Sequence, residues 1–101
     1  MTRGGQSGQV PRLGSLADHV QLVRRMGKAT RADLAAAAET GDLSPPDWAE
    51  MVQTCRRCGW AGGCAEWLAA HPDAASAPEP CLNRARLAVL SVTALLQDEM
   101  A

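Results

Sequence analysis

Apolar residues recur at intervals of three or four along most of the chain, which is the spacing of helices that bury one face. The first such helix is expected between Ser15, as its N-cap, and Gly27, as its end. Its buried stripe should consist of Leu16, Val20, Val23 and Met26.

A short alanine-rich helix should follow, running through Glu39. Thr30 is the predicted N-cap, and Asp33 stands three residues later, as in a capping box. Gly41 would end this helix, since glycine readily takes the conformation that closes a helix.

The segment Ser44-Pro45-Pro46-Asp47 is a strong helix start, because proline suits the first turn and an acidic side chain suits the positive end of the helix. This third helix should reach about Arg57. Its apolar stripe places Cys55 on the buried side, together with Trp48, Met51 and Val52.

The second half of the chain predicts two more helices. Gly59, Gly62 and Gly63 should loosen the chain before a short helix that carries Cys64, Trp67 and Leu68 on one face. A rigid proline-containing loop from His71 to Pro80 then leads to a strongly apolar helix from Leu82 to about Leu96. We therefore expect an all-α fold without strands, a compact bundle of about five short helices.

The expected domain organisation is simple. Residues 1–14 are rich in glycine and polar side chains and predict a flexible tail. Residues 15–101 form a single helical domain, and a chain of this length often needs a metal or a partner to supplement a thin core.

The four cysteines of the chain fall within one short stretch, at Cys55, Cys58, Cys64 and Cys81. In a reducing compartment such a set indicates one metal centre rather than two disulfides. The bundle should be built around this four-cysteine site. Soft thiolates suit both zinc and an iron–sulfur cluster. The uneven spacing, a CxxC pair and two isolated cysteines, favours a [4Fe-4S] cluster over zinc, which remains the alternative.

Several other residues have candidate roles near such a site. Arg56, Arg57, Arg84 and Arg86 flank cysteines in the sequence and would favour the thiolate form. The three tryptophans could shield a cluster from water. His71, before a proline, is expected to be solvated or to cap a helix, and His19 to lie on the surface.

The segment CRRCGWAGGCAEWL, Cys55 to Leu68, resembles the core of the WhiB-like iron–sulfur regulators. Three ligands carry over, whereas the remaining ligand of that family precedes the pair and Cys81 follows it. The longer pattern looks like a family of small bacterial four-cysteine proteins of unknown function. It comprises Gly41-Asp42-Leu43-Ser44, the three clustered cysteines, Trp67-Leu68 and Cys81-Leu82-Asn83-Arg84.

Charge and hydropathy narrow the classes of function. Ten basic and eleven acidic residues nearly balance, so the positive field that nucleic-acid binding requires is missing. No signal-peptide core follows Arg3, and no apolar run approaches the roughly eighteen residues of a membrane span. We therefore expect a cytoplasmic protein without a nucleic-acid or membrane partner.

The expected function follows from the metal centre. No catalytic motif stands out, and four thiolates leave no open metal position, so we do not expect an enzyme. A [4Fe-4S] protein of this kind would sense redox state or iron, or transfer electrons. The alternative is a structural zinc module that binds a protein partner, or a second copy, through its apolar C-terminal helix. That helix could instead be the central helix of the bundle.

Overall fold

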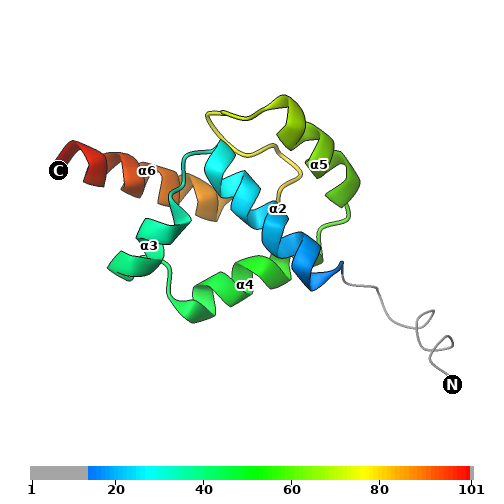
Figure 1. The fold of residues 1–101 in the computed structure, drawn as a ribbon, viewed down its shortest axis with the longest axis horizontal. Helices are drawn as coiled ribbons and strands as arrows, with labels where there is room; N and C mark the ends of the chain where they lie inside the picture. The colour runs from blue at the N-terminus through cyan, green and yellow to red at the C-terminus, as the bar shows by residue number, and fades with distance from the viewer. Residues whose placement is uncertain (1–13, 101) are drawn as a thin grey trace, which may run out of the picture.

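The computed structural model describes residues 14–100, which form five α-helices and no strand. Figure 1 shows the helices joined by short turns and by one long loop between the last two. Their bounds are α2 Leu16–Ala29, α3 Leu34–Thr40, α4 Pro45–Arg56, α5 Ala61–Ala70 and α6 Arg84–Met100. The predicted all-α class and five helices are confirmed.

The tail predicted for residues 1–14 lies outside the described residues, apart from Gly14. That residue is tied to the end of α4, because its backbone N–H donates to the Arg56 carbonyl at 3.1 Å. In return the Arg56 guanidinium donates to the Gly14 carbonyl at 2.8 Å. None of the helices in the described part is long and apolar enough to cross a membrane.

The predicted boundary between α2 and α3 was wrong. Helix α2 continues past Gly27 to Ala29, and Thr30 is its C-cap rather than the N-cap of the next helix. The left-handed residue that turns the chain is Arg31, with a φ of 63°. Asp33 is the N-cap of α3, since its carboxylate accepts from the Ala36 N–H at 3.1 Å. Gly41 ends α3 as predicted.

The buried face of α2 also differs from the predicted stripe. Val23 and Met26 are buried as expected, but Leu16 is exposed and His19 is buried. The inward face is therefore rotated relative to the one that the aliphatic residues alone suggest. It runs through His19, Val23 and Met26, which follow the i, i+4, i+7 spacing of a helix.

Helix α4 begins as predicted, with a complete capping box. The Ser44 hydroxyl accepts from the Asp47 N–H at 3.2 Å, and the Asp47 carboxylate accepts from the Ser44 N–H at 3.2 Å. The same carboxylate lies near the guanidinium of Arg86 in α6. Hydrogen bonds from Ser44, aided by that charge, lower the pKa of Asp47.

The starts of α5 and α6 shift from their predicted positions. Gly62 and Gly63 lie inside α5, and the indole of Trp60 lies so close to Gly63 that a Cβ there would clash with it. Helix α6 begins at Arg84 rather than at Leu82. The reason is that Asn83 turns inward, where its side-chain amide donates to the Met51 carbonyl at 3.0 Å.

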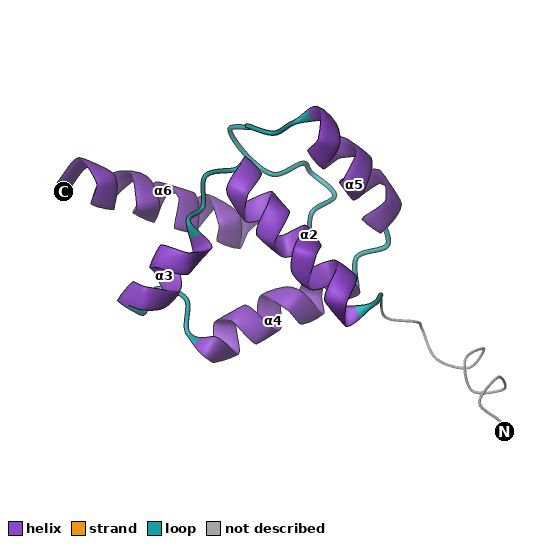
Figure 2. Cartoon of the chain, viewed as in Figure 1, coloured by secondary structure: helices purple, strands orange, loops and turns teal. Residues whose placement is uncertain are grey.

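The core lies where α2, α4 and α5 meet the first half of α6, with Met51 and Leu87 fully buried at its centre. The long loop of residues 71–83, drawn in teal in Figure 2, returns along the end of α2. The Ala74 N–H donates to the Ala29 carbonyl at 2.8 Å, and Asp73 pairs with Arg31. These contacts bring the chain back to the end of α4.

We predict opposite effects for alanine at two helical glycines. A Cβ at Gly27 would lie 2.7 Å from a methyl group of Leu34, so Gly27→Ala should reduce the free energy of unfolding by about 1–2 kcal/mol. Gly62 faces open space, so Gly62→Ala should raise it by about 0.5–1 kcal/mol through better helix propensity. Urea denaturation measures both. Equal effects of the two substitutions would contradict the packing of Leu34 on α2.

Candidate metal centre

Each of the four cysteines is held by a different piece of local structure. Cys55 lies in the last turn of α4, and Cys58 in the turn that follows. Cys64 lies in the first turn of α5, and Cys81 lies in the loop just before α6. Two helix ends, the turn between them and one loop therefore supply the set.

Backbone hydrogen bonds fix the turns that carry these thiols. The Cys58 N–H donates to the Cys55 carbonyl at 3.0 Å, which closes the CxxC turn. The Trp60 N–H then donates to the sulfur of Cys58 at 3.4 Å. At the other end of the site, the Cys81 N–H donates to the Pro78 carbonyl at 3.0 Å. N–H groups directed at sulfur are typical of sites where thiolates bind metals.

All four cysteines border one small cavity of about 20 Å³. The four thiols are free, with Cys64 buried and the other three partly buried. The remaining wall is mostly apolar and comes from Leu22 of α2, Trp60 and Ala61 at the start of α5, and Leu82. The structure therefore brings the four cysteines to one cavity.

As they stand, however, no three His, Cys, Asp or Glu side chains within residues 14–100 are placed so that they could hold one metal ion. The structure supports an all-α bundle with a shared cysteine cavity. A metal at its centre stays a prediction.

The cavity strongly disfavours charged thiolates. Burial raises the pKa of Cys55 to about 12, and repulsion from the other three cysteines adds to the effect. Burial likewise raises the pKa of Cys64 to about 11, with contributions from Cys81 and Cys58. Burial also raises the pKa of Cys81, opposed by a hydrogen bond from the Asn83 backbone. Without a cation, the buried thiols are neutral at physiological pH.

The arginines act on this site differently from the prediction. Of the four arginines named from the sequence, Arg84 opposes the rise in the pKa of Cys81. Arg86 pairs instead with Asp47 and Glu50, and Arg57 donates to the Thr54 hydroxyl. The charge that opposes the rise at Cys64 comes from Arg25 of α2, which is distant in sequence.

His19 is the site residue that the sequence prediction missed. It was expected on the surface, but it is 6% exposed and borders the cysteine cavity. Its Nδ1 lies 2.8 Å from the Ser15 carbonyl, which identifies Nδ1 as the protonated nitrogen. The available signal was its spacing of four and seven residues from Val23 and Met26.

The remaining histidine and the tryptophans fall into two groups. His71 is the exposed C-cap of α5 and stacks on Trp67 at 4.3 Å between ring centroids, which confirms the predicted capping role. Trp60 borders the cysteine cavity, as a shielding residue would. Trp48 and Trp67 pack against the hydrophobic core instead.

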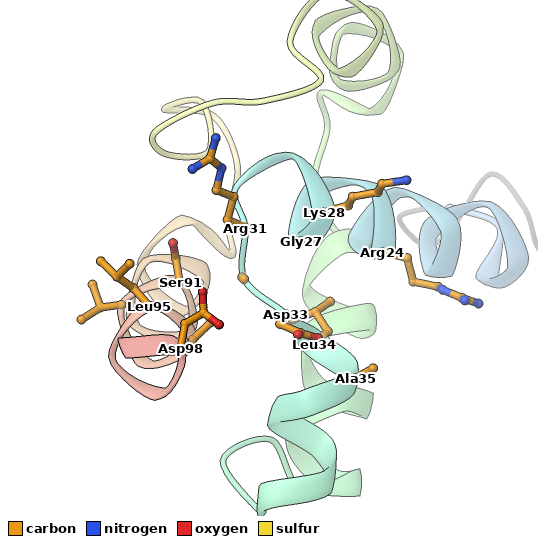
Figure 3. A pocket seen from close by; sticks show the side chains of 13 residues that line it. Arg24, Gly27, Lys28, Arg31, Asp33, Leu34, Ala35, Ser91, Leu95 and Asp98 are labelled. Atoms are coloured by element: carbon orange, nitrogen blue, oxygen red, sulfur yellow. The ribbon is translucent and has the colours of Figure 1, made fainter. Parts of the chain in front are cut away.

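A second and larger cavity, of about 700 Å³, lies away from the cysteines between the α2–α3 turn and α6. Figure 3 shows Asp33 and Leu34 on one side of this groove, and Ser91, Leu95 and Asp98 of α6 on the other. The Ser91 hydroxyl donates to the Thr30 carbonyl at 2.9 Å, which joins the two walls.

The fold and the cavity together define a small all-α protein with four free cysteines around one small cavity. The model of a family of unknown function, DUF6455, matches residues 10–93, and the chain belongs to that family. This confirms the expected membership in a family of unknown function. No curated protein and no solved structure matches the chain significantly.

The raised pKa values predict how the stability of the metal-free, reduced protein depends on pH. Because the folded state keeps Cys55 and Cys64 protonated above their ordinary pKa of 9.0, it binds more protons than the unfolded chain there. The free energy of unfolding should be constant below about pH 9 and fall as the pH rises toward 11–12. Urea denaturation under reducing conditions measures this decrease.

The matched control is the double variant Cys55→Ser/Cys64→Ser, in which neither side chain titrates in this range. It should show a much shallower decrease. An equally steep decrease in the variant would mean that other groups cause it.

Proposed function

We propose that Cys55, Cys58, Cys64 and Cys81 bind one [4Fe-4S] cluster, and that the protein uses it in redox or iron sensing or in electron transfer. The observation that carries this proposal is the single cavity that all four thiols border. Thiols that served only as small core residues would have no reason to gather from two helix ends, a turn and a loop.

The chemistry of the cavity admits thiolates only together with a cation. Bringing four thiolates together is unfavourable without a cation, as the raised pKa values of Cys55 and Cys64 express. Iron or zinc would supply the missing positive charge and displace the protons. Binding should therefore release protons and weaken at low pH.

The surroundings also suit a cluster. Leu22, Trp60 and Leu82 limit access of water, and the Trp60 N–H is directed at the sulfur of Cys58. Both burial and hydrogen bonds to sulfur are levers that set the potential of an iron–sulfur cluster. His19 adds a polar group to the same wall.

The choice of a cluster over zinc rests on the uneven spacing of the cysteines in the sequence, a CxxC pair and two isolated residues. Each thiolate of a [4Fe-4S] cluster binds a separate iron atom, so the four sulfurs surround the core instead of meeting at one point. The cavity would widen through the loops that carry Cys58 and Cys81, which are not held in helices. The local resemblance of Cys55–Leu68 to WhiB-like proteins agrees with this choice for three of the ligands.

A sensing role follows from where the cysteines lie. The ends of α4 and α5 and the start of α6 all meet at the cavity, so loss of the centre would remove a link between three helices. The protein without metal would retain neutral thiols in an apolar cavity, and its helix ends would be less firmly held. Gain and loss of a cluster would then be read out as a change in packing.

Anaerobic purification followed by iron, sulfide and zinc analysis tests this proposal. We expect about four irons and four sulfides per chain, with the broad visible absorption of a cluster. A colourless protein with one zinc per chain would instead support the alternative, in which the same four cysteines form a structural zinc site. A protein that binds neither metal under reducing conditions would refute both.

The ligand set is tested by Cys81→Ser, which removes one of the four donors. We expect loss of more than half of the bound metal and a melting temperature lower than that of the wild-type holoprotein. The control variant Ser76→Ala lies in the same loop but away from the cavity, and it should retain the wild-type metal content and melting temperature. If Cys81→Ser keeps full metal content and an unchanged melting temperature, Cys81 is not a ligand.

A further inference from the structure

Helix α6 has two apolar faces, and only one of them is covered. Leu87 and Leu90 are buried in the core of the chain. A second set of large apolar side chains, each more than half exposed, follows along the outer side of the helix: Val89, Val92, Leu95 and Leu96. We call these four residues the outer face of α6. The prediction that α6 could be the central helix of the bundle was wrong.

The spacing of the outer face is that of a helix–helix seam. Val89, Val92 and Leu96, continued toward both ends by Ala85 and Glu99, follow one another in alternating steps of four and three along the helix, and Leu95 lies beside them. Such a heptad-like stripe faces one direction over several turns and suits a partner helix lying alongside. A stripe of this kind in water is costly unless something covers it.

The charges at the ends of α6 indicate which helix covers it. The first turn contains Arg84 and no acidic residue, and the last turn contains no basic residue but includes Asp98 and Glu99. These charges oppose the dipole of the helix itself, whose N-terminus is positive. Among residues 14–100, no ion pair involves Arg84 or Glu99.

We propose that two copies of this chain pair through their outer faces, with the two α6 helices antiparallel about a two-fold axis. In that arrangement the acidic end of each helix lies beside Arg84 of the other copy, and the two helix dipoles oppose each other favourably. A parallel pair would bring like charges together at both ends.

The larger cavity adds to this surface. Val92 and Leu95 belong to the outer face and also line the groove beside the α2–α3 turn. In Figure 3 the labelled Leu95 lies on the α6 side, where it points away from the rest of the chain. A second helix on the outer face would therefore cover the open edge of the groove as well. This pairing does not depend on the metal that the cysteines bind.

The mass of the full-length protein in solution tests the pairing. Sedimentation equilibrium up to millimolar concentration should give twice the chain mass of 10.6 kDa. Val92→Glu places a charge in the seam and should raise the dissociation constant by at least about a hundredfold. Because Val92 is exposed in the single chain, helix content should not change. Gln21→Glu adds the same charge at an exposed position of α2 and should leave the dimer intact.

A wild-type protein that stays monomeric over this range overturns the proposal. A dimer that Val92→Glu leaves unaffected overturns it too, since the contact would then use another surface. A wild-type monomer that dimerises only with a different protein would also count against a second copy as the partner.

The antiparallel orientation has its own test. Glu99→Arg and Arg84→Glu should each weaken the dimer about five- to tenfold, because each puts like charges together at both symmetric contacts. The dissociation constant of the double variant Arg84→Glu/Glu99→Arg should return to within about threefold of the wild-type value, since the reversed charges again face each other. Failure of the double variant to recover would overturn the antiparallel pairing.

Discussion

Four thiols that face one small, mostly apolar cavity are the constraint around which this fold is arranged. Burial and mutual repulsion raise the pKa of Cys55 to about 12 and that of Cys64 to about 11. The cavity therefore tolerates the thiols only as neutral groups or as ligands of a cation. That choice between two states is the physical basis of the proposed metal centre.

The rest of the chain serves to bring the fourth cysteine to the other three. The long loop after α5 is tied to α2 through Ala74 and Asp73, and then to α4 through the Asn83 amide and the Met51 carbonyl. These contacts place Cys81 beside the ends of α4 and α5. The C-terminal half of α6 extends past α3 in Figure 1 and takes no part in the site. The cysteine cavity and the outer face of α6 are therefore separate features of the structure.

Where neighbouring residues decide the local structure, the sequence was sufficient to predict it. The segment Ser44-Pro45-Pro46-Asp47 marked the start of α4 correctly, because a helix N-terminus is fixed by its own neighbouring residues. The grouping of the cysteines was also predictable from their spacing. The start of α3 was not, because Thr30 and Asp33 are both good caps and the positive φ of Arg31 decided between them.

Where packing between distant segments decides the structure, the sequence led to wrong predictions. His19 was assigned to the surface because it lies off the aliphatic stripe of α2, yet the packing of α2 against α4 and α5 buries it beside the cysteines. The influence of Arg25 on Cys64 likewise arises only in three dimensions. The spacing of apolar residues in α6 could not show that one apolar face of this helix stays uncovered, because that depends on which face packs against the core.

Alkylation of the cysteines, followed by mass spectrometry of the native and the chelator-treated protein, tests most directly whether the four thiols share one centre. If they do, all four are protected in the protein as purified under anaerobic conditions, and loss of the metal raises the alkylation rate of all four, because the helix ends that bury the neutral thiols are then less firmly held. If any one of Cys55, Cys58, Cys64 and Cys81 reacts at the same rate before and after metal removal, a single centre bound by all four is contradicted.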